Sequence, residues 1–237
     1  MSGFSPLLRN LLILVFLLAA GLAAIAVSGI WVSRVEQPTY QALASEGPLE
    51  LRDYPALIVA ETRTTGTRRE ALEKGFRLLA DFIFGANTPS AVEPATQTPA
   101  GTETAPTDLK TSAMEATSVQ VSAKSVRIPM TAPVIQQADG AEGWLVRFVL
   151  PRTLTLETLP RPLSAQVRLM ALPPARYVAF RFTGFVDEQK VKDATAAAEA
   201  YAKSLGKTPR GEPLVAFYNP PWTLPFMRRN EVLIEVD

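Results

Sequence analysis

Residues 216–232 read Ala-Phe-Tyr-Asn-Pro-Pro-Trp-Thr-Leu-Pro-Phe-Met-Arg-Arg-Asn-Glu-Val, and they constrain the fold more than any other stretch of this chain. Proline fixes φ and removes a backbone donor, so three prolines here exclude a helix or a central strand. We expect a stiff, aromatic loop that joins the apolar runs at 214–218 and 232–236. Such a loop forms either a packed lid on the core or one wall of a binding cleft.

The chain on either side of this loop alternates between strand and helix patterns. Apolar alternation or continuous apolar runs predict strands at residues 49–64, 119–134, 144–150, 165–171, 177–183, 214–218 and 232–236. Helical spacing predicts two helices, at 67–84 and 188–205. The first helix begins with the capping box Thr67-x-x-Glu70, and Gly85 follows it in the position of a helix-terminating glycine.

The segments before the two helices resemble each other. Residues 55–66 and 174–184 both begin with Pro-Ala, contain an apolar strand and lead to a predicted helix. We therefore expect an α+β fold of two pseudo-symmetric strand-helix-strand halves, with antiparallel strands around a core and the helices outside. Residues 88–118 are a low-complexity Thr/Pro/Ala-rich tract without aromatic residues, which predicts a disordered insertion.

The amino-acid composition excludes several kinds of catalytic and binding site. The formal net charge of the 237 residues is +1, which argues against a general nucleic-acid binder. The chain has no cysteine and no histidine, so disulfides, thiol catalysis and triads that need histidine are excluded. Glu50 and Arg52 are spaced as a surface ion pair. With no phosphate loop and no metal-ligand cluster, the sequence predicts a protein that is not an enzyme.

Residues 1–36 predict an N-terminal membrane segment, and residues 37–237 predict the folded domain. Leu11–Val32 is apolar and, as a helix, is about 33 Å long, enough to cross a bilayer. The charge bias favours an inner-membrane, single-pass signal anchor with a periplasmic or extracellular domain. The alternative is a signal peptide cleaved near Ala26, which would leave a secreted protein.

Three stretches in this order resemble the SOUL haem-binding family. They are Leu49-Glu50-Leu51-Arg52-Asp53-Tyr54-Pro55, Ile128-Pro129-Met130-Thr131-Ala132-Pro133-Val134 and the loop 219–232. The resemblance covers roughly residues 40–237, apart from the low-complexity tract. It implies a distorted antiparallel β-barrel of two similar halves with two helices, and binding of haem or a related tetrapyrrole. The expected bacterial, membrane-anchored member would bind no nucleic acid.

The family's haem site is a cleft between the first helix and the C-terminal loop. Carried onto this chain, the resemblance implies contacts from Phe76, Arg77, Ala80, Trp222, Phe226, Met227 and Arg228. Arginines suit propionate carboxylates. Without histidine or cysteine, only Tyr, Met or Lys remain as iron ligands, for example Tyr218, Met227 or Met130, and we expect weak or no axial ligation.

Two alternatives remain open. One is a binding module for another lipophilic small molecule, with Glu212 or Glu231 as a buried carboxylate in an apolar cleft; the two-half architecture is similar to effector-binding modules of bacterial regulators. The less favoured alternative is a hydrolase that uses one of these carboxylates with Tyr218.

Overall fold

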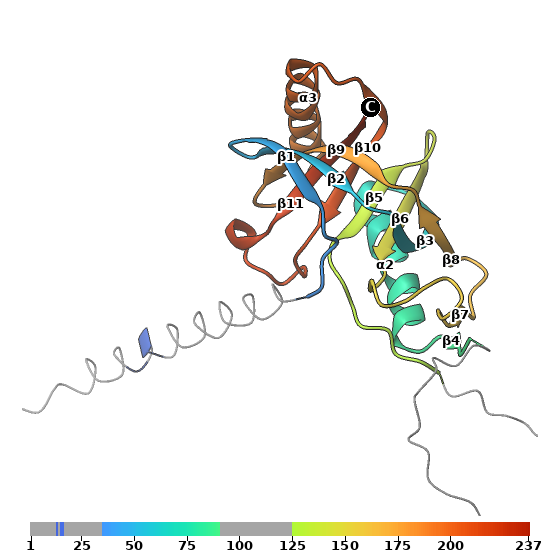
Figure 1. Ribbon diagram of the computed structural model, residues 1–237. Helices are drawn as coiled ribbons and strands as arrows, with labels where there is room; N and C mark the ends of the chain where they lie inside the picture. Colours follow the sequence, from blue (N-terminus) through green and yellow to red (C-terminus); the bar gives the residue numbers. More distant parts are fainter. Residues whose placement is uncertain (1–12, 14, 17–34, 91–124) are drawn as a thin grey trace, which may run out of the picture.

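The computed structural model describes residues 13, 15–16, 35–90 and 125–237 (Figure 1). Its strands are β1 (Gln41–Glu46), β2 (Leu49–Tyr54), β3 (Leu57–Thr65), β4 (Asn87–Thr88), β5 (Val134–Ala138), β6 (Gly143–Val149), β7 (Arg161–Pro162), β8 (Arg168–Leu172), β9 (Ala175–Phe182), β10 (Pro209–Phe217) and β11 (Asn230–Val236). The helices are α2 (Arg68–Phe84), α3 (Glu188–Ser204) and the short 3-10 helix η1 (Pro225–Met227). The described part of the chain is therefore α+β, as predicted.

Nine strands form one antiparallel sheet in the order β1-β2-β9-β11-β10-β5-β6-β3-β8. The order β5-β6-β3-β8 with α2 in one half is repeated as β10-β11-β9-β2 with α3 in the other, and the halves meet where β5 pairs with β10. Two similar halves are thus present in the topology. The expected barrel is not closed within the described residues, because β1 and β8 remain at the two ends of the sheet order.

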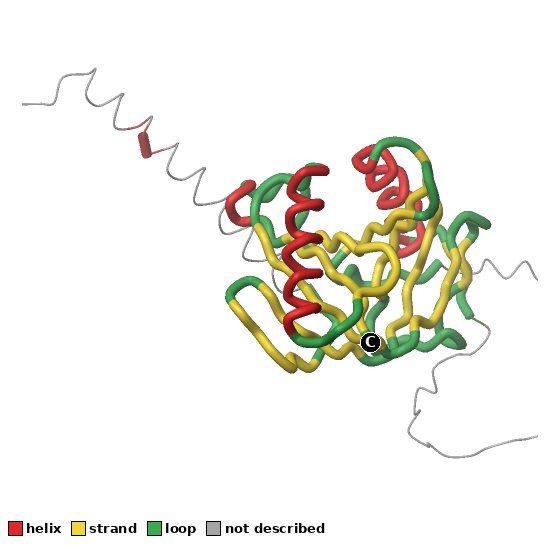
Figure 2. The backbone as a smooth tube through the Cα atoms, turned by 90° about the horizontal axis from the view of Figure 1, so that it is seen from above, coloured by secondary structure: helices red, strands yellow, loops and turns green. Residues whose placement is uncertain are grey.

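Both helices cover the same face of the sheet, as Figure 2 shows from above. Directly paired residues lie on the same face of an antiparallel sheet, and the register links Val232 with Val215, and Val215 with Gln136. Val232 and Val215 pack with α3, whereas Val146, the partner of Gln136, packs with α2. Among the described residues, one face of the sheet is therefore covered by α2 and α3, and no helix packs on the other, which we call the helix-free face.

Local sequence explains how α2 forms and packs. Thr67 caps the helix, accepting from the Glu70 backbone N–H, and the Glu70 side chain accepts from the Thr67 backbone N–H, which confirms the predicted capping box. Gly75 faces the sheet so closely that a Cβ there would stand 2.6 Å from the Cβ of Val146. The helix can approach β6 only because this position has no side chain.

Several predicted boundaries change. The predicted strand at 119–134 is wrong for residues 125–133, which are not in a named strand, and residues 119–124 lie outside the described ranges. Val134 instead begins β5. Strand β1 was not predicted, and of the predicted disordered tract only residues 88–90 are described, with Thr88 in β4. Tertiary pairing, rather than local hydrophobicity, determines these edge elements.

Among the residues that the structure describes, no helix has the length and apolar content needed to cross a bilayer. Most of the predicted membrane segment Leu11–Val32 lies outside the described ranges. The continuous described chain begins at Val35, which packs against the buried cluster that contains Tyr218.

Candidate functional site

A buried ion cluster occupies the helix-free face. The carboxylate of Glu231 in β11 is 0% exposed and accepts hydrogen bonds from Arg52 (Nη1 to Oε2, 2.7 Å), Arg229 (Nη2 to Oε1, 2.8 Å) and Tyr218 (OH to Oε2, 2.8 Å). Arg181 adds a longer contact of 3.3 Å. Arg52 also donates to Glu50 at 2.7 Å, so the predicted ion pair is present, but Arg52 is fully buried, and the expectation that this pair lies on the surface is wrong.

The protonation states of this cluster are fixed by burial and charge. Burial alone raises the pKa of Glu231, but the hydrogen bond and charge of Arg52, with the charge of Arg229, outweigh it and lower the pKa to about 2. Burial and the Glu231 charge raise the pKa of Tyr218 well above its ordinary value. Glu231 therefore stays ionised and Tyr218 stays protonated at neutral pH.

A pocket of about 250 Å³ opens on the same face beside this cluster. Its apolar lining includes Leu214 and Leu233, which are cross-strand partners in β10 and β11. Tyrosine rings form another part of the lining: Tyr54 lies edge-on to Tyr177 at a centroid distance of 5.8 Å, and 5.1 Å from Tyr40. The pocket thus has aromatic walls built from the N-terminal segment, β2 and β9.

Charged side chains complete the pocket lining. Arg147 donates to Glu61 at 2.7 Å and to the Gln137 side chain at 2.8 Å. Arg210 is exposed, as are the two carboxylates of Glu212 and Glu235. The arrangement offers apolar and aromatic surface with charged groups of both signs, which suits an amphipathic ligand.

The predicted α2 residues lie in a different environment. Phe76 is 37% exposed and its ring packs edge-on against Phe148 at 5.3 Å, while Ala80 packs against the core of its half. Arg77 lines a separate cavity of about 390 Å³, together with the cations Lys74 and Arg63. Phe76 and Ala80 thus serve packing at least in part, whereas Arg77 belongs to a basic cavity beside α2.

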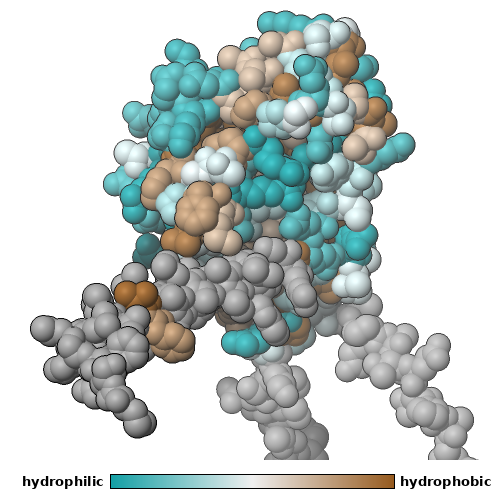
Figure 3. All heavy atoms as spheres, turned by 90° about the vertical axis from the view of Figure 1, so that its left-hand side faces the viewer, coloured by the Kyte–Doolittle hydropathy of each residue, from teal (hydrophilic) through white to brown (hydrophobic). Residues whose placement is uncertain are grey.

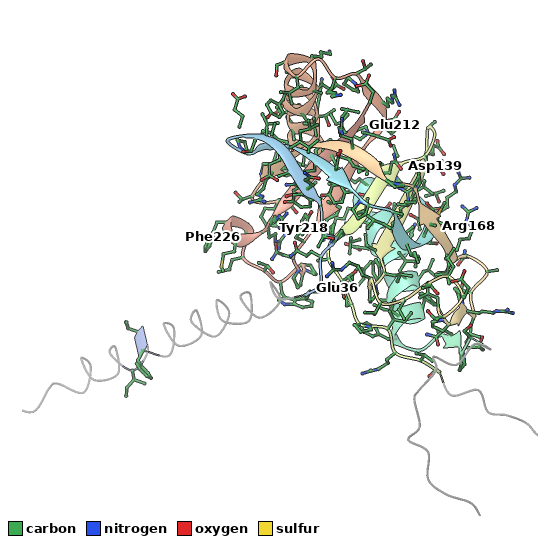
Figure 4. The ribbon with its side chains drawn as sticks, in the orientation of Figure 1. Glu36, Asp139, Arg168, Glu212, Tyr218 and Phe226 are labelled. Atoms are coloured by element: carbon green, nitrogen blue, oxygen red, sulfur yellow. The ribbon has the colours of Figure 1, made fainter. Side chains whose placement is uncertain are left out.

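The predicted loop residues lie around η1. Trp222 and Phe226 are 69% and 73% exposed, and Figure 4 shows Phe226 projecting from the edge of the domain. Met227 is half-buried. Arg228 donates to the carbonyl of Thr223 at 2.8 Å and so holds the loop together.

The structure does not bring these two groups together. In Figures 1 and 2 alike, the η1 loop lies beside the half that contains α3, and α2 belongs to the other half. The β9–α3 turn meets the loop instead, through the Gly184 N–H, which donates to the Pro225 carbonyl at 2.9 Å. The assignment of these residues to a haem site stays a prediction.

Sequence reasoning missed Tyr54 and Tyr177, and it underrated Arg52. The available signal was the alternation in Leu49-Glu50-Leu51-Arg52-Asp53-Tyr54, which puts Arg52 and Tyr54 on one strand face. Which face would be covered was not visible, because Arg52 meets Glu231 across 179 positions of sequence. Of the candidate iron ligands, Tyr218 is engaged with Glu231 and Met130 packs against the core.

The C-terminal domain of EcmrR shares this fold at low sequence identity: it is 11% identical with a TM-score of 0.50, over 84% of this chain and 98% of that domain. A structure described as a hydrolase from Listeria innocua is 10% identical with a TM-score of 0.49, over 82% of this chain and 94% of that one, and supports no conclusion. At 11% identity the likeness to EcmrR shows the fold alone.

The family follows from sequence. No curated protein matches the chain. The sequence model described as SOUL heme-binding protein, however, matches residues 35–235, which include both halves of the sheet, both helices and the η1 loop. This confirms the resemblance carried by the three motifs: the chain belongs to the SOUL heme-binding protein family.

Proposed function

We propose that this chain is a membrane-anchored, non-enzymatic protein that binds haem or a related tetrapyrrole without an axial histidine or cysteine. Family membership over residues 35–235 supports tetrapyrrole binding. The observation that points to a site is the tyrosine-lined pocket on the helix-free face, which combines aromatic rings with arginine side chains.

The residues present fit a tetrapyrrole that is held by its faces and its carboxylates. Leu214, Leu233 and Tyr177 supply apolar contact for a macrocycle, and the exposed Arg210 is placed in the lining to pair with a propionate. At about 250 Å³ the pocket is slightly smaller than pockets that enclose drug-sized ligands, which measure about 300–1,000 Å³. We therefore expect one side of the macrocycle to enter the pocket and the other to remain at its mouth.

Iron would contribute little to this binding. Histidine and cysteine are absent from the chain, and Tyr218 is a protonated donor to Glu231. Burial also raises the pKa of Tyr54 and of Tyr177, which disfavours the phenolate that would bind iron. Apolar contact and propionate pairing would therefore supply the affinity, and metal-free protoporphyrin should bind within a few-fold of haemin. Bound haem would supply its iron-centred chemistry, while the protein's own residues orient the ring and exclude water from one of its edges.

The test is a titration of the detergent-solubilised full chain with haemin, followed at the Soret band against a detergent blank. We expect a saturable shift that Tyr177→Ala weakens at least tenfold, because that substitution removes an aromatic wall. Phe76→Ala and Trp222→Ala are matched controls, because they remove aromatic rings from the site implied by the family resemblance. Loss of binding only in these two variants would move the site to α2 and the η1 loop. A flat titration of the folded chain would overturn the proposed function.

A second candidate is binding of another lipophilic molecule, and one observation favours it. The pocket lining includes the exposed carboxylates of Glu212 and Glu235, which suit a lipophilic cation rather than a ligand with propionates. The double variant Glu212→Gln, Glu235→Gln separates the two functions. It should strengthen binding of a dicarboxylate tetrapyrrole and weaken binding of an aromatic cation. Glu231 does not serve this second function, because arginines already neutralise it.

The membrane part of the proposal rests on Leu11–Val32, with the domain on the periplasmic or extracellular side. N-terminal sequencing of the protein purified from membranes tests it. Retention of the first residues, together with resistance to carbonate extraction, supports an anchor. A mature chain that begins shortly after Ala26 would instead support the cleaved, secreted form.

A further inference from the structure

Three aromatic side chains stand out from one edge of the domain. Phe226 is 73% exposed, Trp222 is 69% exposed and Phe185 is 60% exposed. Figure 3 looks onto the side of the molecule where the η1 loop lies, and apolar side chains gather there among polar ones. We call Phe185, Trp222 and Phe226 the aromatic edge. Large apolar side chains left in water forgo the stabilisation that burial would bring, so an exposed group of them indicates a contact surface.

The loop that bears the aromatic edge is held firmly at its base. Thr223 is buried, and Arg228 donates to its carbonyl at 2.8 Å while stacking over the Phe185 ring at 4.9 Å. The Gly184 N–H donates to the Pro225 carbonyl at 2.9 Å. The rings are therefore displayed by an internally bonded loop that joins the β9–α3 turn to η1, and do not depend on a loosely tethered segment.

The chain enters the domain at the base of the same loop. Val35 packs against the cluster that contains Tyr218, Glu36 pairs with Thr131, and Arg229 donates to the Gln37 side chain at 3.1 Å. Arg229 directly follows the residue that stacks on Phe185. The entry point of the N-terminal segment is thus fixed next to the aromatic edge.

This entry point limits how far the domain can stand from a membrane. The apolar run Leu11–Val32 ends three residues before Val35, and three extended residues span at most about 11 Å. If this run is the membrane anchor, as proposed above, Val35 stays within about that distance of the apolar run's end, at the bilayer surface. The aromatic edge, bonded to the same part of the domain, is then held beside the headgroup layer at high effective concentration.

We propose that the aromatic edge is a membrane-docking surface, and that Trp222, Phe226 and Phe185 insert into the interface of the bilayer that holds Leu11–Val32. Aromatic rings prefer this level of a membrane, where the apolar ring is shielded and polar atoms remain hydrated. Docking would fix the orientation of the domain on the bilayer. It would also keep the pocket, which Gln37, Pro38 and Tyr40 help to line, close to the lipid phase from which a lipophilic ligand would arrive.

Tryptophan fluorescence tests this proposal, because the chain contains three tryptophans: Trp31, Trp144 and Trp222. The full-length variant with Trp31→Phe and Trp144→Phe, reconstituted into phosphatidylcholine vesicles, reports on Trp222 alone. With lipids brominated close to the headgroups, we expect roughly twofold weaker emission than with unbrominated lipids, as for a residue at the interface. If Trp144→Phe prevents folding, Trp31→Phe alone suffices, since the Trp144 emission gives a constant background.

Matched single-tryptophan variants keep the failure of docking distinct from failure of the anchor. The variant that retains only Trp31 should be quenched if Leu11–Val32 is inserted, and the variant that retains only Trp144 should not be quenched. Quenching of Trp31 without quenching of Trp222 overturns docking and leaves the anchor intact. Quenching of neither overturns both, whereas quenching of Trp222 alone supports docking and contradicts the anchor. A third outcome is that brominated lipids do not quench Trp222, but Trp222 becomes shielded from solvent as the protein-to-lipid ratio rises. This outcome would assign the aromatic edge to a contact between two copies of the chain.

Discussion

Glu61 in the first half of the sheet and Glu231 in the second both bind arginines from neighbouring strands on the helix-free face. Glu61 contacts Arg147 at 2.7 Å and Arg168 at 3.3 Å, but the Arg168 side chain is 65% exposed. Glu231 binds Arg52, whose side chain is only 1% exposed, although its longer contact, Arg181, is 46% exposed. We call the Glu231 cluster sealed because it contains a fully buried arginine, and we call the Glu61 cluster open because its more buried arginine, Arg147, is 12% exposed.

The seal comes from segments that the first half lacks. The Tyr40 ring lies 4.3 Å from the Arg52 guanidinium, and Tyr218 and Arg229, from either end of the η1 loop, close on Glu231. A repeated strand pattern thus sets where the charges stand, whereas the non-repeated N-terminal segment and C-terminal loop determine how deeply they are buried. Because burial controls the strength of charge interactions, the two glutamates should respond differently to substitution.

The largest expected effect tests this contrast directly. Glu231→Gln removes one of the two counter-charges of the buried Arg52, whose other partner is Glu50 at 2.7 Å, and should lower the free energy of unfolding by about 3 kcal/mol. Glu61→Gln, whose partner Arg168 can turn to water, should cost about 1–3 kcal/mol. Urea unfolding of the full chain in detergent, followed by circular dichroism, measures both. Equal losses would show that the sealed and open clusters do not differ in energetic terms.

The free energy of unfolding should depend on pH in the acid range through Glu231 in the sealed cluster. Because the folded-state pKa of Glu231 is lowered from 4.5 to about 2, its contribution to stability is fully present above about pH 4.5 and is lost as pH falls towards 2. The shift corresponds to a contribution on the order of 3 kcal/mol. Unfolding free energies measured across this pH range should fall more steeply for the natural chain than for Glu231→Gln. Parallel curves would contradict the assignment.

A smaller loss of stability is expected from a substitution that tests how the two helices pack on the sheet. Gly75→Ala places a Cβ 2.6 Å from the Val146 Cβ, and this overpacking should cost about 1–3 kcal/mol despite the higher helix propensity of alanine. In α3 the buried positions Ala194 and Ala198 already carry a Cβ, so the constraint belongs to α2. The cost of Gly75→Ala should be smaller when it is measured in a chain that already carries Val146→Ala. Urea unfolding of the single and double variants measures this difference. An unchanged cost there would mean that the clash with β6 is not its cause.

Local signals in the sequence predicted the repeated parts of the fold well. Helix α2 begins at the predicted capping box and ends at Gly85, and α3 spans residues 188–204 against a prediction of 188–205. The family motifs at 49–55, 128–134 and 219–232 predicted the family correctly. These features depend on neighbours a few residues apart, which is why they can be read from one chain.

The candidate pocket was not predicted from the sequence. The family resemblance directed attention to Phe76 in α2 and to Trp222 in the loop between β10 and β11, and their role stays a prediction, whereas the pocket around Tyr54 and Tyr177 was not foreseen. Tyr177 pairs with Arg52 only through the β2–β9 register. No local pattern around either residue specifies that register, so the composition of the pocket could not be predicted.

The sequence by itself determined the α+β class, the two helices, the stiff proline-rich loop and the absence of histidine and cysteine ligands, because each depends on residue type or short-range spacing. Only the tertiary structure decided that Arg52 and Glu231, 179 positions apart, form a buried pair, and that the rings of the aromatic edge face outward. The physical reason is that burial is a property of the whole assembled sheet. A charged or aromatic residue has the same local pattern whether its strand face or loop is covered or left exposed.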